Sequence, residues 1–364
     1  MATPRITVGL PAYKGADLIG KALDCLQRQT YDNFEAIISI DGNDEETAAA
    51  CRSFLSDTRF HMVVQPERLD WVGNFNWLLQ QKLNEFFCYR QHDDTTAPEF
   101  FEVLLKLADE DKDAAAIYCD CQDEYDGVPT HLEISDSIVG EPVDRLLQYF
   151  DRYSAVPLRG LIRSAAIRQA GLVRADEFRA PHQVYGWLAK LLRWGNFRRL
   201  PEPLYYKLDH PQTFTRQFFN DTRDRHRAAW PTIFTGALEA AMPLCHTPQA
   251  RLVVQQALLY RIVGFPRLRP HDETTSSTEL IAECMARLKQ EGNAHLLRDD
   301  ELPAVLRGVS GGANFVTPSP LRRGLYRIGE WARLPKILYP ESRWQRLAQH
   351  GRQILRTLKR RLRL

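Results

Sequence analysis

Short apolar runs alternate with amphipathic segments of helical spacing through the first 120 residues, and this alternation limits the fold more than any other feature. The expected strands are 6–10, 34–40, 60–64, 86–90 and 114–118. Between them, apolar residues recur at the spacing of one helix face over 18–26, 45–55, 71–83 and 98–107. A strand-helix alternation of this kind predicts an α/β domain with a mainly parallel sheet flanked by helices.

The composition is that of an ordinary globular protein. Of 364 residues, 44% are hydrophobic and 26% are charged, and the length suits two or three domains. No apolar run approaches the ~18 residues of a spanning helix. The first residues, MATPRITVGLPAYKG, lack the basic and then apolar pattern of a secretory signal, so we expect a cytoplasmic protein.

Seven cysteines are scattered through apolar segments, which favours reduced thiols over a disulfide framework. Cys119 and Cys121 form the one close pair. No second pair stands at zinc-site spacing, so we expect two small buried strand residues, with a metal site as the alternative.

Acidic residues follow two of the expected strands at their carboxyl ends, where open parallel sheets bind ligands. Asp41 begins an Asp-Gly turn in which Gly42 allows close approach of a ligand; an ordinary turn is the alternative. Asp93 and Asp94 follow the fourth strand. Paired carboxylates suit Mn²⁺ or Mg²⁺ with substrate phosphates completing the coordination, whereas the alternative is a helix cap formed by Asp94 or Thr95.

Several motifs together resemble a known family. They are Leu10-Pro11-Ala12-Tyr13, Gln29-Thr30-Tyr31-Asp32-Asn33-Phe34-Glu35, Ile40-Asp41-Gly42-Asn43-Asp44, Gln65-Pro66-Glu67-Arg68, Gly73-Asn74-Phe75-Asn76 and His92-Asp93-Asp94 with Pro98. Over residues 5–120 this set resembles the family 2 glycosyltransferases, which have the GT-A fold. A weaker similarity, through Arg159-Gly160-Leu161-Ile162-Arg163 and Pro203-Leu204-Tyr205-Tyr206, continues to about residue 216.

The resemblance implies a role for each matching position. Residues of the donor nucleotide site would be Pro11, Ala12 and Tyr13 around the base, Asp41 and Arg68 at the nucleoside, and Gly42 and Asn76. Asp93 and Asp94 would hold Mn²⁺ or Mg²⁺ and the diphosphate, with His210 and Arg216 nearby. Two positions depart from the family, because Ile40 and Gln91 stand where many members have an acid.

The base that would deprotonate the acceptor is the weakest part of the match. Members of the family usually have an acid just before the helix that here begins near Val184, but this chain has Pro181-His182-Gln183. His182 has a suitable unperturbed pKa near ~6.5. Asp176 and Glu177 are the alternatives.

The expected organisation has three parts. Residues 1–220 form the GT-A domain, with donor and metal sites in 1–120 and the acceptor side in 121–220; 221–310 are helical, and 311–364 are a basic amphipathic tail. Residues 321–364 carry 13 Lys and Arg but two Asp and Glu. Such a tail suits an interfacial helix on anionic lipid at the cytoplasmic face of the inner membrane. Packing on the acidic body is the alternative. Nucleic-acid binding is disfavoured, because no nucleic-acid module accompanies the charge.

These features predict an inverting, metal-dependent hexosyltransferase that uses a nucleotide-sugar donor, with UDP favoured. Its acceptor would be a cell-surface or lipid-linked glycan. The main alternative is a nucleotide-sugar-binding scaffold or regulator without turnover, because the family's acid before the Val184 helix is missing. A nucleotidyltransferase and a dinucleotide dehydrogenase are disfavoured, because no Gly-rich phosphate loop follows the first strand.

Overall fold

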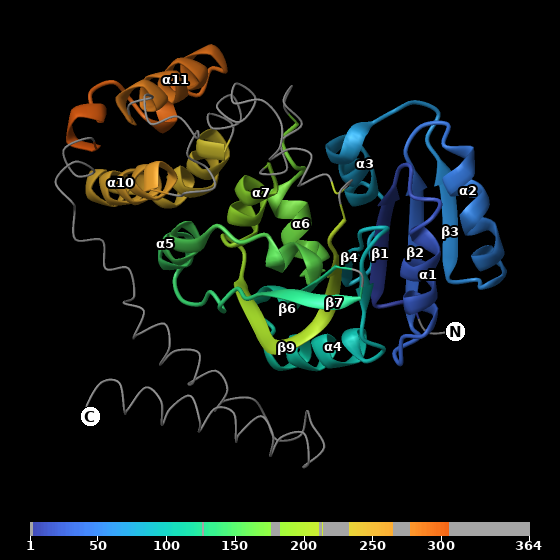
Figure 1. The fold of residues 1–364 in the computed structure, drawn as a ribbon. Helices are drawn as coiled ribbons and strands as arrows, with labels where there is room; N and C mark the ends of the chain where they lie inside the picture. Colours follow the sequence, from blue (N-terminus) through green and yellow to red (C-terminus); the bar gives the residue numbers. More distant parts are fainter. Residues whose placement is uncertain are drawn as a thin grey trace. The chain divides into compact units, whose positions relative to one another are not determined.

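The computed structural model describes residues 3–125, 127–175, 183–210, 213, 233–264 and 277–305 (Figure 1). The chain divides into two units, 1–313 and 314–364, and the second lies outside the described residues. Among the helices that are described, none combines the length and the apolar character needed to cross a membrane.

The amino-terminal half of the sheet consists of four parallel strands in the order β3-β2-β1-β4 (Figure 1). These strands are β1 (Ile6–Ala12), β2 (Phe34–Ile40), β3 (Phe60–Val64) and β4 (Phe86–Tyr89). All residues from Ile6 to Leu10 are buried, although neighbouring residues point to opposite faces. Helices must therefore cover both faces, as is usual for parallel sheets.

Beyond β4 the sheet becomes mixed, in the order β4-β8-β6-β9-β5, with β7 paired to β6. The strands are β5 (Thr95–Thr96), β6 (Ala114–Tyr125), β7 (Val128–Glu133), β8 (Leu161–Arg163) and β9 (Asn196–Leu208). β8 is antiparallel to both neighbours, whereas β6 and β9 are parallel. The expected strand at 114–118 is thus longer and continues into a hairpin with β7.

Helices in the amino-terminal half fall into two groups by contact. α1 (Ile19–Gln27) packs beside α2 (Glu45–Cys51). Just after α1, the Gln29 side-chain oxygen accepts the Phe101 amide of α4 (Phe100–Glu110) at 3.1 Å. α3 (Asp70–Leu79) contacts β1 and β2, and Phe75 packs edge-on against Trp187 of α7 (Gln183–Leu191). α5 (Pro142–Arg152) and α6 (Ser164–Ala170) complete this part.

The expected helical region contains α10 (Pro248–Gly264) and α11 (Ser277–Gln290), preceded by helical residues 233–241. Ion pairs join it to the α/β part. Glu239 binds Arg174 at 2.7 Å and Lys190 of α7 at 3.1 Å. Gly186 of α7 also lies against Gly236, since a Cβ at Gly186 would be 3.0 Å from the Gly236 Cα.

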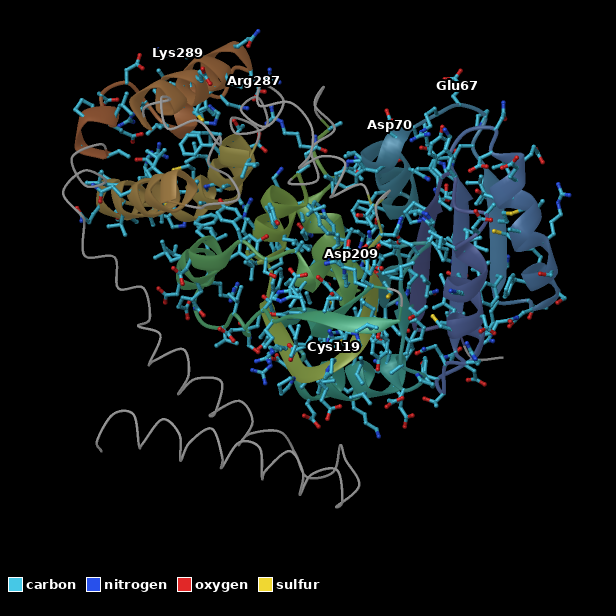
Figure 2. The ribbon with its side chains drawn as sticks, viewed as in Figure 1. Glu67, Asp70, Cys119, Asp209, Arg287 and Lys289 are labelled. Carbon is cyan, nitrogen blue, oxygen red and sulfur yellow. The ribbon has the colours of Figure 1, made fainter. Side chains whose placement is uncertain are left out.

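The close cysteine pair lies in β6, and both thiols are free and buried. Figure 2 labels Cys119 in this part of the sheet. Burial raises the pKa of the Cys119 thiol to about 12. Both residues are thus small, apolar contributors to the core.

Candidate functional site

A cluster of Tyr13, Asp41 and Arg68 lies in the segments that follow β1, β2 and β3. The Arg68 Nε lies 2.7 Å from Asp41 Oδ2, and its guanidinium carbon lies 3.1 Å from the centre of the Tyr13 ring. Tyr13 and the Arg68 side chain are 37% and 41% exposed. Figure 2 labels Glu67 and Asp70, which flank Arg68 along the chain, near the start of α3. An aromatic face and a cation together form a solvent-facing surface on which a planar base can stack.

Asp41 is almost completely buried beneath this surface, at 2% exposed. Burial raises the pKa of its carboxyl, while the hydrogen bond from the Leu69 amide (2.6 Å) and the charge of Arg68 act in the opposite direction. The two bonds hold both carboxylate oxygens in fixed positions. Pro11 and Ala12 end β1 beside it, and the Ala12 carbonyl accepts the Asp41 amide at 2.8 Å.

The turn after Asp41 has the conformation that its sequence suggests. Gly42 has φ +72°, a region that residues with a Cβ seldom adopt. Asp44 caps α2 by accepting the Thr47 amide at 3.2 Å, and it also accepts the Lys14 amide at 2.5 Å. This turn therefore fixes the loop that follows β1 as well as the start of α2.

The loop after β1 touches the loop after β4. A Cβ on Gly15 would lie 2.4 Å from His92 Cδ2, so the two loops pack directly against each other. The base-stacking surface at Tyr13 and the acidic pair next to His92 are thereby parts of one edge of the sheet, as the strand order predicts.

Asp93 and His210 meet at this edge. Asp93 Oδ2 lies 3.2 Å from His210 Nε2, and the Asp93 side chain is 12% exposed. Asp93 Oδ1 is buried and has no hydrogen-bond partner within the described residues. A buried carboxylate oxygen without a donor is a good position for a hard cation, so the residues present fit Mn²⁺ or Mg²⁺. No group of three or more His, Cys, Asp or Glu side chains that could hold a metal was found in the described part of the chain.

Asp94 has a different environment from its neighbour. Its Oδ2 accepts the Tyr205 hydroxyl at 2.7 Å, its Oδ1 accepts the Leu208 amide at 3.1 Å, and the residue is 1% exposed. Burial and the adjacent Asp93 carboxylate raise the pKa of Asp94 to about 7. The helix-capping alternative is wrong, because β5 follows directly and α4 begins at Phe100 without a side-chain cap.

Other predicted site residues are not brought to this edge by described contacts. The Asn76 amide exchanges two hydrogen bonds of 2.8 Å with the backbone of Val173, so it connects α3 to the segment that follows α6. Its predicted contact with the donor stays a prediction. Four further candidates lie outside the described residues, namely Asp176, Glu177, His182 and Arg216.

The sequence interpretation gave no role to three residues that surround Asp94. Arg90 and Arg159 place their guanidinium carbons 5.0 and 5.8 Å from the centre of the Tyr205 ring. Arg90 is fully buried and donates to Thr96 Oγ1 at 3.2 Å. Arg159 and Tyr205 belong to the weaker motifs near 159–163 and 203–206, but pattern alone does not show which side chains of a buried strand face the site.

Part of the chain matches a known protein family. Residues 7–167 match the family model described as glycosyl transferase family 2. An uncharacterized glycosyltransferase of Rickettsia typhi is 26% identical over 121 residues, which are 32% of this chain and 36% of the relative. The Bacillus subtilis protein EpsH, named as a candidate glycosyltransferase, is 24% identical over 150 residues, which are 41% of this chain and 43% of the relative. The chain therefore spans well under half the length of the curated relatives that it matches.

Solved structures show the same fold. The crystal structure of residues 1–349 of S. aureus TarS in complex with UDP-GlcNAc has a TM-score of 0.58 and 15% identity, and the match covers 96% of this chain and 92% of that one. The UDP complex of the same protein has the same TM-score and identity. Residues 7–167 of this chain thus match glycosyl transferase family 2, and the shared sheet shows that the chain has the GT-A fold.

Proposed function

We propose that this protein is a glycosyltransferase that moves a sugar from a nucleoside diphosphate donor, UDP-sugar being favoured, to a hydroxyl group of a glycan. The observation that carries the proposal is the pairing, at one sheet edge, of a base-stacking surface with a buried carboxylate oxygen that has no donor. The first is Tyr13 with Arg68 above Asp41, and the second is Asp93 Oδ1. A nucleoside diphosphate has a planar base at one end and phosphate charge at the other, so it fits this arrangement.

The nucleoside would bind at Tyr13, Asp41 and Arg68. The base stacks on the Tyr13 ring, and the Arg68 guanidinium is at present over that ring, so it must move aside or stack on the base. Asp41 is held by Leu69 and Arg68 with its carboxylate at a fixed position, ready to accept a base N–H or a ribose hydroxyl. The loop at Gly42 lets the ribose approach the backbone closely.

The diphosphate would bind on the side of Asp93. We propose that Asp93 would hold Mn²⁺ or Mg²⁺, with His210 beside it. Both Asp94 oxygens already accept hydrogen bonds, so we propose that Asp94 positions Asp93 and does not bind the ion. A bound divalent cation neutralises phosphate charge and so stabilises a leaving nucleoside diphosphate. Asp93 would hold the ion, and Asp94 fixes the loop that carries Asp93 through its bonds to Tyr205 and Leu208.

An inverting transfer needs a base on the acceptor side. The candidates His182, Asp176 and Glu177 stay predictions. Along the chain they lie between Val173, whose amide donates to Asn76, and Gln183, the first residue of α7. A cell-surface or lipid-linked glycan is the proposed acceptor, with the basic tail as a membrane contact. Tail and base both lie outside the described residues.

Calorimetry and thermal shift with UDP, GDP, dTDP and CDP, each with and without Mn²⁺, test the donor site directly. We expect tight binding of one nucleotide, UDP by preference, that depends on Mn²⁺. If a folded sample binds none of them, the transferase proposal is wrong.

A binding scaffold without turnover is the second candidate, and one feature favours it. The family's acid is missing before α7, where the first residue of the helix is the buried Gln183. Release of nucleoside diphosphate from the sugar donor, measured with lipid-linked acceptors, separates the two candidates. Binding without release over a range of acceptors would favour the scaffold.

A further inference from the structure

Arg159 is a buried cation beside Asp94, and one of its N–H groups has no acceptor. Its side chain is 12% exposed, and its Nε is buried without a hydrogen-bond partner within the described residues. Its nearest carboxylate oxygen, Asp94 Oδ2, is 4.0 Å away and already accepts the Tyr205 hydroxyl. A guanidinium has five N–H donors in a planar fork that matches phosphate oxygens, and a buried N–H without an acceptor, such as the Nε–H of Arg159, is costly.

The backbone around Arg159 is fixed. Arg159 ends the short 3₁₀ helix η2 (Val156–Arg159), and Gly160 follows it. A Cβ at Gly160 would lie 2.0 Å from the Ile117 carbonyl oxygen, so this connection lies directly against β6 and only glycine fits there. On the other side, the Tyr205 ring lies 5.8 Å from the guanidinium carbon. Arg159 is therefore placed in advance rather than carried by a free loop.

Position and charge indicate what the ligand would be. Arg159 lies beside Asp94, the neighbour of the proposed cation ligand Asp93, and thus at the phosphate end of the site rather than at Tyr13. The adjacent Arg90 adds a second buried positive charge at 5.0 Å from the Tyr205 ring. An anion near Arg159 would meet the two arginines and the proposed cation, against the carboxylates of Asp93, Asp94 and Glu133.

Building on the proposed function, we infer that Arg159 binds a diphosphate oxygen of the nucleotide donor and stabilises the negative charge of the leaving nucleoside diphosphate. The acceptor hydroxyl oxygen forms a bond to the sugar carbon and gives its proton to the acceptor-side base. The bond from that carbon to the diphosphate oxygen breaks, and its electron pair goes to the diphosphate oxygen. The hydrogen bond from Arg159 to the diphosphate would become stronger as negative charge develops on the leaving group. Tyr205 acts as a positioning residue, because it holds Asp94 and contacts the Arg159 guanidinium.

The test compares UDP with uridine on the full chain in the presence of Mn²⁺. We expect Arg159→Gln to weaken UDP binding by roughly 10-fold or more, since a charge-assisted hydrogen bond is lost, and to leave uridine binding unchanged. Arg159→Lys keeps the charge without the planar fork and should restore part of the affinity. It also keeps the proposal testable if Arg159→Gln does not fold.

Arg168→Gln is the matched control, because Arg168 is exposed on α6. We expect it to bind UDP and uridine as the wild type does. Wild-type UDP affinity in folded Arg159→Gln and Arg159→Lys would overturn the inference, as would an equal loss for uridine. If the wild type itself binds no nucleotide, it is the proposed function that fails.

Discussion

Asp93 and Asp94 are adjacent acids that differ in their hydrogen-bond partners. We therefore expect mutation of each residue to have a different effect. Asp94 has a donor for each oxygen, whereas Asp93 Oδ1 has none within the described residues. A buried group without a partner contributes little to folding, so its position is better explained by a ligand.

Asp93→Ala should therefore separate binding from stability. We expect Mn²⁺-dependent UDP binding to fall by at least about 10-fold while the melting temperature stays close to wild type. Thermal shift with and without UDP and Mn²⁺ measures both quantities. Asp32→Ala, at an exposed aspartate before β2 on the opposite edge of the sheet, is the control and should change neither. Loss of the fold in Asp93→Ala would contradict the assignment.

Tyr205→Phe should instead lower stability. The change leaves the buried Asp94 Oδ2 without the hydroxyl that it accepts at 2.7 Å, which costs about 1–3 kcal/mol of unfolding free energy. Denaturant unfolding measures the loss, and adding Asp94→Asn in a double-mutant cycle shows how much of it belongs to this pair. A Tyr205→Phe protein as stable as wild type would show that Asp94 does not depend on the hydroxyl.

The positions and contacts of these residues could be predicted only in part. Motif similarity identified Asp41, Arg68 and Asp93, and the structure places them at neighbouring strand ends. The separate use of Asp94 could not be predicted, because its donors Tyr205 and Leu208 lie 111 and 114 residues away along the chain. Hydrogen bonds over such separations depend on the register of β9, which local patterns do not contain.

At the scale of elements, periodicity predicted the amino-terminal strands well. Strands 34–40 and 60–64 were predicted with the bounds that β2 and β3 have. These strands are mainly apolar runs between segments of helical spacing, so the signal is strong. β9 was not predicted as a strand, because Asn196–Leu208 contains two prolines and several charges. It is nevertheless a central strand, since β6 pairs with it on one side and β5 on the other.

The first turn of α7 contains another buried group without partners. Gln183 is 3% exposed, and neither its amide nitrogen nor its oxygen has a hydrogen-bond partner within the described residues. It borders a cavity that Arg174, Trp187 and Glu239 also line. Such a carboxamide is destabilising unless a ligand or water satisfies it.

Gln183→Met removes this polar group at similar size. We expect the free energy of unfolding to stay the same or to rise by about 1 kcal/mol, as measured by denaturant titration. Gln255→Met is the matched control, because the Gln255 amide donates to the Leu296 carbonyl at 3.1 Å and to Glu301 at 2.9 Å. That control should lose stability. A loss in Gln183→Met as large as in the control would mean that the Gln183 amide has a partner in solution.

At the scale of the whole molecule, charge separates the tail from the rest. Residues 321–364 hold 13 of the 48 Lys and Arg but two of the 46 Asp and Glu, so the chain before them is acidic although the total is +2. An acidic body would be repelled by an anionic membrane, whereas the tail would be attracted to it by about 1 kcal/mol for each basic residue near the surface. If the acceptor is lipid-linked, the tail would keep the site near its substrate.

Truncation after Pro320 tests this arrangement, and it leaves intact the unit that ends at Ala313. We expect the full chain to sediment with vesicles that contain anionic lipid and the truncated chain to stay in the supernatant, because only the full chain carries the basic segment. Zwitterionic vesicles should bind neither, and 0.5 M salt should release the full chain, since exposed charges are then screened beyond roughly 4–5 Å. UDP binding should be equal in both proteins, because the residues of the proposed donor site lie within the first unit. A full chain that fails to bind anionic vesicles would leave the tail with its alternative role of packing against the acidic body.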